Sequence, residues 1–349
     1  MSERFRRGLV VGKFAPLHRG HELLIRRALA ASDEVIVISY SKPEIPGCAP
    51  DRRERWLEAL FPQTRRLVLT DERLGRLVPP EAEFTEVPAN DADPATHRHF
   101  VGFVCASILG VDVDAVFTGE AYGRQFADAL TVYFRRHAPA HAAVRHVLVD
   151  RALGGPLVSG TVIRRDVHAN RHWLRPSVYA SFVRRVCLLG GESSGKSTLA
   201  RALSRTYETE YVAEYGRELW VRRCGELAFA DLRRIAERQV ALEEAAARRA
   251  KGVLFCDTSP LTTLCYSQCM FGRADAVVER LADRQYDLCV LCAGDFEFVQ
   301  DGTRRGAAFR SWQQRWYLEQ LTRRRMPWLL ATGGIEERIA QVRERLGTA

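Results

Sequence analysis

Short apolar runs alternate with longer helical patterns along the whole chain, and this alternation predicts parallel α/β sheets. In the first half the strand-like runs are RGLVVGKF, DEVIVISY, RRLVLTD, DAVFTGE and VRHVLVD. In the second half they are VRRVCLLGG, ETEYVAEYG, GVLFCDTS, YDLCVLCAGD and MPWLLATGG. The fold class that we expect is therefore α/β, with two doubly wound parallel-sheet domains.

Helical patterns such as HELLIRRALAAS and DRRERWLEALF separate these strands. The long stretch FADLRRIAERQVALEEAAARRAKG is a charged helix, which we interpret as a solvated cover over the second sheet. Near residues 171–184, Pro176 interrupts a helical pattern just before a fresh buried strand. We therefore expect a first domain over residues 1–172 and a second domain over residues 183–349.

The composition fits two globular domains, because 46% of the 349 residues are hydrophobic and 27% are charged. The net charge is +9, but only four residues are lysine, so arginine supplies nearly all of the positive charge. Without a zinc-finger spacing, an RNA-recognition signature or a basic tail, we expect no nucleic-acid partner. No apolar run has the length of a membrane span and no signal peptide is recognisable, so we expect a cytoplasmic location.

Two of the four lysines, Lys13 and Lys196, fall in candidate phosphate motifs, where a compact ammonium with three donors is useful. Among the nine cysteines, Cys289 and Cys292 form a single C-x-x-C pair inside an apolar run. Without a second pair, buried thiols in a reducing compartment fit this pattern better than a zinc site does.

The first phosphate motif is GKFAPLHRGH, which follows an apolar strand and opens a helix. A helix N-terminus presents backbone N–H groups and the positive end of the helix dipole to an anion. His18 and His21 are three residues apart, so both imidazoles can face one phosphate and stabilise its charge. The residues that we expect to bind nucleotide here are Gly12, Lys13, Phe14, His18, Gly20 and His21.

The stretch VSGTVIRRD, late in the first half, complements this turn. Ser159 or Thr161 can cap the helix that follows, which is the structural interpretation. The functional interpretation adds Arg164, one turn later, as a grip on a polyphosphate tail. The nucleotide-binding residues expected here are Ser159, Gly160, Thr161 and Arg164.

The second phosphate motif, GGESSGKST, matches the pattern G-x-x-x-x-G-K-[ST] between an apolar strand and a helix. Backbone N–H groups from Gly191 to Ser197 would form an anion nest. Lys196 would reach the β- and γ-phosphates, and the Ser197 hydroxyl would bind Mg²⁺. The expected nucleotide-binding residues are Gly190, Gly191, Glu192, Ser193, Ser194, Gly195, Lys196, Ser197 and Thr198.

Charged residues after the next strands favour a kinase over other phosphate-loop proteins. Asp257 ends an apolar strand, where it suits a metal-side carboxylate or a general base; capping a helix is the structural alternative. Glu214 and Arg217 follow the preceding strand, at the edge where open α/β sheets bind ligands. Arg304 and Arg305 suit a lid over the transferred phosphoryl group, or an ordinary arginine-rich surface loop. No guanine-specificity element or transporter signature is present.

Together these motifs resemble one family. GKFAPLHRGH, FTGEAYGRQFADAL and VDRALGGPLVSGTVIRRD resemble the adenylyltransferase domain of bifunctional NadR-type proteins, which belongs to the H-x-G-H nucleotidylyltransferase superfamily. LLGGESSGKSTLA, VAEYGREL, DTSPLTT and VQDGTRRG resemble the ribosylnicotinamide kinase domain of the same family. The resemblance runs from Gly8 to about Arg338. It implies an H-x-G-H Rossmann-like domain followed by a P-loop kinase domain.

The resemblance implies two reactions with a shared intermediate. The kinase domain would phosphorylate nicotinamide riboside with ATP, giving nicotinamide mononucleotide (NMN), and the adenylyltransferase domain would join NMN to the adenylyl group of ATP, giving NAD and pyrophosphate. Lys13 and the two histidines would contact ATP phosphates, while residues 159–164 would hold the β- and γ-phosphates. Asp257 or Glu214 would activate the riboside hydroxyl, with Arg217 and Asp295 holding the substrate. Mg²⁺, bound by Ser197 and Asp257 in the kinase, would bridge the phosphates.

Each half would bind its own MgATP, because the first site cleaves at the α-phosphorus and the second at the γ-phosphorus. Other interpretations stay open: a kinase whose front domain only senses nucleotide, a regulatory protein coupled to a riboside transporter, or an enzyme for a different pyridine nucleotide. The first strand begins within ten residues of Met1, so we expect no helix-turn-helix segment and no repressor role. A homo-oligomer also stays open.

Overall fold

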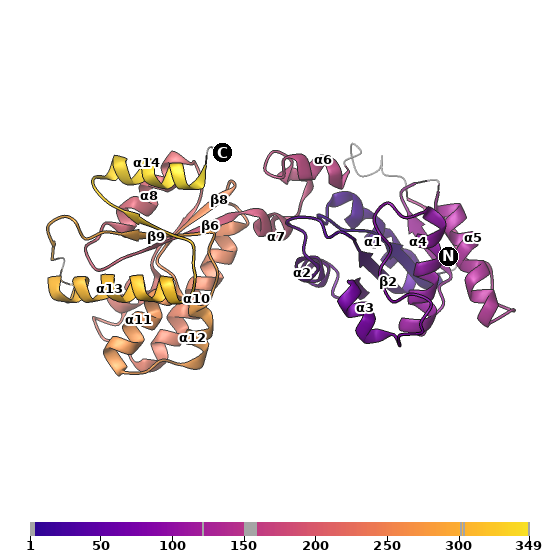
Figure 1. The fold of residues 1–349 in the computed structure, drawn as a ribbon, viewed down its shortest axis with the longest axis horizontal. Coiled ribbons are helices and arrows are strands. Elements are labelled where there is room, and N and C mark those ends of the chain that lie inside the picture. The colour runs from indigo at the N-terminus through magenta and orange to yellow at the C-terminus, as the bar shows by residue number, and fades with distance from the viewer. Residues whose placement is uncertain (1–3, 121, 150–158, 301, 303, 348–349) are drawn as a thin grey trace. The chain divides into compact units, whose positions relative to one another are not determined.

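The computed structural model describes residues 4–120, 122–149, 159–300, 302 and 304–347. Residues 121, 150–158, 301 and 303, which belong to stretches that carry the family resemblance, lie outside the described residues. The chain divides into two compact units, residues 1–181 and 182–349, each described by itself (Figure 1). Each unit holds a five-stranded parallel sheet flanked by helices, so the predicted fold class is confirmed.

The first sheet has the strand order β3-β2-β1-β4-β5. Its strands are β1 (Phe5–Val11), β2 (Ser32–Tyr40), β3 (Arg65–Leu69), β4 (Ala115–Thr118) and β5 (Arg145–Leu148). All neighbouring strands are parallel. The order reverses between β1 and β4, and open α/β sheets bind their ligands beside the carboxyl ends of the strands at such a point.

Helices cover both faces of this sheet. On one face Ile36 and Ile38 of β2 join a buried cluster with Phe100 and Leu130. The first helix contacts β1 and β2 without joining that cluster, so it covers the opposite face. The helices are α1 (Arg19–Ala31), α2 (Pro50–Leu60), α3 (Asp71–Leu77), α4 (Pro94–Phe103), α5 (Gly123–His137), α6 (Gly160–Arg165) and α7 (Pro176–Tyr179). Shorter turns are η1 (Val104–Ile108), η3 (Arg171–Trp173) and η4 (Ala180–Phe182).

The second sheet has the strand order β10-β9-β6-β8-β7, again parallel throughout. Its strands are β6 (Arg184–Leu189), β7 (Tyr211–Val212), β8 (Val253–Asp257), β9 (Leu288–Cys292) and β10 (Trp328–Ala331). The chain fills one side of β6 with β8 and β7 and then crosses to β9. The loop after β6 therefore opens at the reversal point, as the phosphate motif requires.

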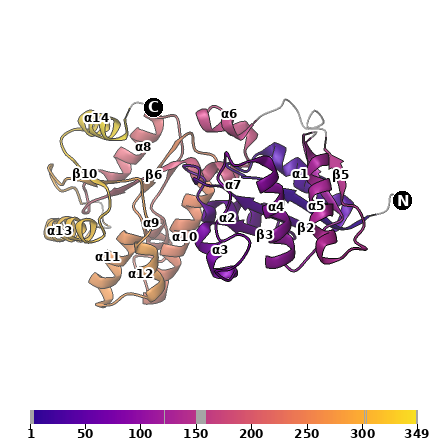
Figure 2. The same ribbon diagram turned by 45° about the vertical axis from the view of Figure 1, so that its right-hand side comes forward.

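Two layers of helices enclose the second sheet. Figures 1 and 2 both show α8 and α14 along one face and α10, α11 and α12 along the other. Val186 and Leu188 of β6 pack with Leu199, Leu203 and Val342 in one buried cluster. The helices are α8 (Lys196–Thr206), α9 (Tyr215–Arg222), α10 (Phe229–Ala247), α11 (Pro260–Phe271), α12 (Ala276–Ala282), α13 (Ala307–Arg323) and α14 (Ile335–Leu346). Over the described residues, no helix has both the length and the apolarity that crossing a membrane demands.

All of the predicted strands are present, and the structure refines two expectations, one for a strand and one for a helix. β7 keeps only Tyr211–Val212 of its longer run, because it is an edge strand and the chain enters α9 at Tyr215. The charged helix forms α10, but the interpretation of it as a solvated cover is incomplete. Asp231, Gln239 and Glu243 of this helix are buried. Hydrogen bonds from the N–H of Ala228, the N–H of Tyr215 and the Tyr286 hydroxyl compensate for their burial.

Arg284→Ala is expected to destabilise the second unit by about 3–5 kcal/mol, because it leaves a buried carboxylate without its cationic partner. Glu243 is fully buried and accepts hydrogen bonds from Arg284 Nε and the Tyr286 hydroxyl, each at 3.0 Å. The matched control is Arg233→Ala, which removes an exposed pair with Glu237 on the same helix and should cost about 0.3–0.5 kcal/mol. Urea unfolding measures both variants, and equal losses would contradict the structural role of Arg284.

Candidate active sites

The turn between β1 and α1 is shaped by close packing around two glycines. Phe14 is fully buried and has φ of 48°, a left-handed conformation that is uncommon for a bulky residue and recurs at ligand sites. A Cβ at Gly12 would lie 3.3 Å from the Phe14 ring, and one at Gly20 would lie 3.0 Å from the His18 ring. Glycine at both positions therefore lets the aromatic and imidazole rings approach the backbone.

The histidine pair is held by the first turn of α1. His18 is the N-cap of this helix, and its Nδ1 accepts the N–H of Gly20 at 3.1 Å. The Nδ1 of His21 accepts the N–H of His18 at 3.5 Å. In the neutral rings the proton is therefore on Nε2 of both histidines. The rings are stacked with their centroids 3.8 Å apart, which holds two N–H donors close together at a helix N-terminus.

The late element of the first half lies against this turn. Ser159 caps α6, with its Oγ accepting the N–H of Val162 at 3.3 Å. Arg164 donates to the carbonyl oxygen of Ala15 and, at 2.9 Å, to Thr161 Oγ1. A Cβ at position 160 would lie 3.2 Å from the same Ala15 oxygen, so any larger residue would crowd this approach. The two motifs that the sequence separates therefore form one site.

Two cations converge at this site. Partial burial lowers the pKa of Lys13, and the neighbouring Arg164 guanidinium lowers it further. Burial and the charge of Lys13 likewise lower the pKa of His97. Charges of one sign that approach each other, here without a counter-ion among the described residues, favour binding of an anion, and a polyphosphate is the anion that fits the neighbouring imidazoles.

Arg53 holds the backbone of Lys13 in place, a contact that was not expected from the sequence. It is fully buried, donates to the carbonyl oxygen of Lys13 at 3.3 Å and pairs with Glu44 Oε1 at 2.8 Å. Its place beside Trp56 and Leu57 on the buried face of α2 is the one signal that the sequence offered, since a buried arginine is normally paired.

The phosphate loop between β6 and α8 adopts the backbone that its glycines permit. Gly190 has φ of 139°, and a Cβ there would lie 2.6 Å from the carbonyl oxygen of Cys292 and 2.8 Å from Ser194 Oγ. Gly195 has φ of 81° and is the N-cap of α8, while Ser193 has φ of 57°. Successive turns of this kind point backbone N–H groups into one concavity.

The start of the loop is used differently from what we expected. The N–H groups of Gly191 and Glu192 donate to Gln314 and Gln313 of α13, at 3.3 and 2.9 Å. Because these two N–H groups point at α13, fewer backbone donors are left for the predicted anion nest. Lys196 Nζ lies across the loop, 2.9 Å from the carbonyl oxygens of Gly190 and Gly191.

Two cavities adjoin at the carboxyl edge of the second sheet. The first, of about 630 Å³, is lined by the loop residues Ser193, Ser194, Gly195, Lys196, Ser197 and Thr198, and by Asp257. The second, of about 410 Å³, is lined by apolar and aromatic side chains that include Trp220, Leu227, Leu232, Ile235, Tyr266 and Met270. Glu214, Arg217 and Arg304 line both. A cavity at the phosphate loop therefore opens beside a cavity suited to an organic ring.

Two carboxylates lie at the phosphate end of this arrangement. Asp257 ends β8 and is 3% exposed, with no hydrogen-bond partner for its Oδ1 among the described residues. Glu214 precedes α9, with its Oε2 3.5 Å from Arg217 Nε. Burial raises the pKa of Glu214, and the negative charge of Asp257 raises it further. A carboxylate pair with one raised pKa is typical of a site that binds or moves a proton.

The residues present fit a magnesium ion. Across the part of the chain that the structure describes, no cluster of three or more His, Cys, Asp or Glu side chains forms a metal site. Mg²⁺ at a phosphate loop needs less than this, since it keeps waters and binds substrate phosphates. Asp257, whose Oδ1 has no hydrogen-bond partner among the described residues, and Ser197 line the same cavity, so they would hold the ion there.

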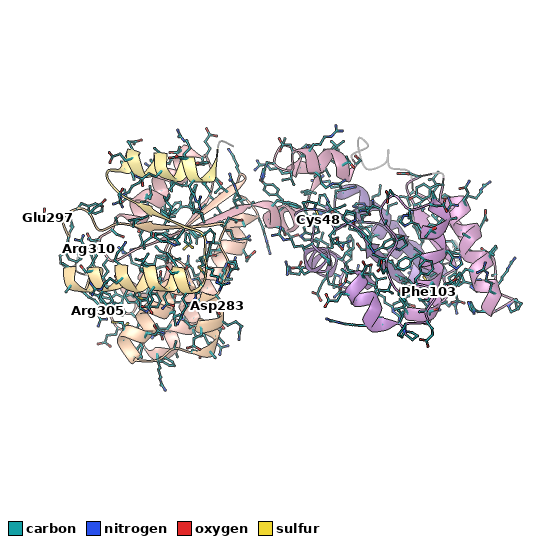
Figure 3. The ribbon with its side chains drawn as sticks, viewed as in Figure 1. Cys48, Phe103, Asp283, Glu297, Arg305 and Arg310 are labelled. Atoms are coloured by element: carbon teal, nitrogen blue, oxygen red, sulfur yellow. The ribbon has the colours of Figure 1, made fainter. Side chains whose placement is uncertain are left out.

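The arginine-rich segment before α13 closes onto the phosphate loop. The N–H of Val299 donates to Ser193 Oγ at 3.0 Å, and the N–H of Arg305 donates to Glu192 Oε2 at 2.6 Å. Figure 3 shows Arg305 and Arg310 near the start of α13, with Glu297 on the loop after β9. Arg304 lines both cavities, whereas Arg310 donates to the carbonyl oxygen of Phe296 at 3.0 Å. Of this group, Arg304 is best placed to reach a ligand.

Asp295 is placed differently from what we expected. Its carboxylate pairs with Arg338 and accepts the N–H of Gly333 at 2.7 Å, and it lines neither cavity. The physical reason is Arg338, which is 2% exposed and also donates to the Ser194 carbonyl oxygen at 2.8 Å. Arg338, which sequence reasoning missed, thus ties the phosphate loop to the ends of β9 and β10, and Asp295 orients it.

Known proteins place this arrangement in a family. Residues 185–338 match the family model described as AAA domain. The trifunctional NAD biosynthesis/regulator protein NadR of Escherichia coli (strain K12) is 30% identical over 317 residues, which cover 85% of this chain and 71% of that protein.

Two solved structures share the fold. The NadR protein in complex with NR is 20% identical, with a TM-score of 0.63 over 98% of this chain and 96% of that one. The NadR protein in complex with NAD and AMP-PNP is 19% identical, with a TM-score of 0.62 over 99% and 97%. From the identity and coverage of the Escherichia coli relative, together with these motifs, the chain belongs to the NadR family of NAD biosynthesis proteins.

Proposed function

We propose that the chain is a bifunctional NAD salvage enzyme with one reaction in each unit. Residues 182–349 would phosphorylate nicotinamide riboside with ATP, and residues 1–181 would join the resulting NMN to the adenylyl group of a second ATP. The observation that supports the proposal is the presence of two candidate phosphate sites of different chemistry in two separate compact units. One is built on a histidine pair and the other on a phosphate loop.

In the kinase each of the two cavities would bind one substrate. The phosphate loop and Lys196 would hold the triphosphate in the larger cavity, while the riboside ring would lie against Trp220 and Tyr266 in the smaller one. The hydroxyl that accepts the phosphoryl group would then face Asp257, our choice for the base. Mg²⁺, held by Asp257 and Ser197, would neutralise charge on the phosphates.

In the adenylyltransferase no covalent intermediate is needed. The phosphate of NMN would attack the α-phosphorus of ATP while pyrophosphate leaves, so catalysis depends on positioning and on charge stabilisation. The Nε2–H groups of His18 and His21 would donate to phosphate oxygens. Lys13 and Arg164, whose mutual repulsion an anion relieves, would hold the leaving pyrophosphate.

Separate assays of the two sites test the proposal. With nicotinamide riboside and MgATP we expect ADP and NMN, because the second unit cleaves at the γ-phosphorus. With NMN and MgATP we expect pyrophosphate and NAD, because the first unit cleaves at the α-phosphorus. Release of ADP in the NMN assay, without pyrophosphate, would contradict the assignment of the first unit.

Asp257→Asn is expected to lower kcat for riboside phosphorylation by about 10²-fold or more, as removal of a general base does. It should also move the pH profile of the residual activity. Glu214 becomes protonated as the pH falls through its raised pKa, so activity that needs its carboxylate is lost on the acid side. Removing the Asp257 charge lowers that pKa, so the acid limb of kcat/KM should shift to lower pH. Glu214→Gln should abolish this limb, and an unshifted limb in Asp257→Asn would contradict the coupling.

A further inference from the structure

Gln239, in the wall of the smaller cavity of the second unit, carries a buried donor that has no partner among the described residues. This side chain, on α10, is 2% exposed and is part of the lining of the 410 Å³ cavity. Its Oε1 accepts the N–H of Tyr215 at 3.1 Å, while its Nε2 has no hydrogen-bond partner among the described residues. Buried amide donors are nearly always paired, so this one indicates a ligand atom that accepts.

The orientation of the carboxamide follows from its one bond. The N–H of Tyr215 is the first backbone donor of α9 and can only donate, so it requires the amide oxygen of Gln239 to face it. The NH₂ group must then point the other way. Exchanging the two amide atoms would place two donors against each other and leave the helix N–H unpaired.

The position of Gln239 identifies the part of a ligand that it meets. Tyr215 directly follows Glu214, which lines both cavities, so Gln239 lies at the phosphate end of the smaller one. Ile235 and Leu232, about one and two turns earlier on α10, line the same cavity farther along the helix. An acceptor nucleoside must place its sugar at the phosphate end and its ring among the apolar side chains.

Building on the proposed kinase function, we propose that Gln239 is a specificity-determining residue whose Nε2 donates to a ribose hydroxyl oxygen of the acceptor nucleoside. It would select ribosides over deoxyribosides, because a sugar that lacks the hydroxyl leaves a buried donor unpaired. Glu214 and Arg217 at the same end would hold the remaining sugar hydroxyls.

Two variants separate binding from support of α9. Gln239→Glu keeps an oxygen for the Tyr215 N–H but removes the donor, whereas Gln239→Leu removes both. We expect each to raise KM for nicotinamide riboside about tenfold while KM for ATP stays within about twofold. Wild type should discriminate against the 2′-deoxy or the 3′-deoxy riboside, and both variants should lose that discrimination.

Several results would overturn the inference. If Gln239→Glu matched wild type and only Gln239→Leu were impaired, Gln239 would merely support α9. If both variants kept the preference for the riboside but no longer distinguished pyridine riboside, which lacks the carboxamide, the donor would face the base. If thermal unfolding shows that Gln239→Glu does not fold, the activity of Gln239→Leu on the riboside and the two deoxyribosides decides whether Gln239 contacts the sugar.

The proposed substrate can fail separately. If wild type phosphorylated adenosine or uridine but not nicotinamide riboside, the assigned substrate would be wrong, and the same deoxy comparison on the active riboside would decide the role of Gln239. If none of these nucleosides were phosphorylated or raised the Tm of wild type, the inference would be overturned together with the kinase proposal.

Discussion

Lys196→Ala is expected to lower the rate of nicotinamide riboside phosphorylation by about 10²–10³-fold while NMN adenylylation stays within about twofold of wild type. Lys196 lines the phosphate cavity of the second unit, where its ammonium lies over the loop carbonyl oxygens. A triphosphate would draw this ammonium onto the β- and γ-phosphates, and alanine leaves their charge uncompensated. The first unit has its own sheet and its own cations, so its reaction should continue.

A matched control for this variant is Lys251→Ala in the same unit. Lys251 is exposed and pairs with Glu208 at 3.4 Å, before β8 begins. Such a surface pair contributes about 0–1 kcal/mol, so both reactions should stay close to wild type. The two activities are read as ADP and pyrophosphate release under saturating substrates. Loss of both activities in folded Lys196→Ala would mean that the two reactions share a site.

His21→Ala is expected to have the reverse effect, with NMN adenylylation lowered by about 10²–10³-fold and riboside phosphorylation unchanged. Alanine removes one donor of the pair and also the acceptor of the His18 N–H at the helix N-cap. The remaining ring of His18 keeps its bond to Gly20 but loses its stacking partner. A reaction supplied with riboside should therefore stop with NMN accumulated.

The matched control here is His137→Ala, because His137 is exposed in the last turn of α5. It should leave both activities intact. Full adenylylation by His21→Ala would show that the histidine pair has no part in the reaction. Weak turnover by wild type with tight nucleotide binding would favour a regulatory protein that binds ATP as a switch.

The fold was largely predictable because each buried parallel strand is visible in its own stretch of sequence as a short apolar run. Every predicted strand is present, and each phosphate motif lies in the turn between a strand and a helix, as predicted. The departures occur where tertiary position decides. β7 is short because it is an edge strand, and α10 buries charged groups because Arg284 and Tyr286 bond to its Glu243.

The sites were predictable only where the residues of one continuous motif determine the local backbone conformation. The loop at 190–198 and the turn at 12–21 form as the spacing suggests, although the roles of their residues stay predictions. Arg53, Gln239 and Arg338 were missed, since a buried polar side chain is identified by its partner and these partners lie in other elements. Asp295 was expected to hold the substrate for the same reason, because no residue near it in the sequence indicates its ion pair with Arg338.

The most direct test is one incubation of the pure protein with nicotinamide riboside and MgATP, with the products resolved over time. We expect NMN and ADP to appear first, and NAD and pyrophosphate to follow as NMN is consumed. NMN that accumulates without NAD would contradict the proposed activity of the first unit. An absence of NMN would contradict the proposed substrate of the second.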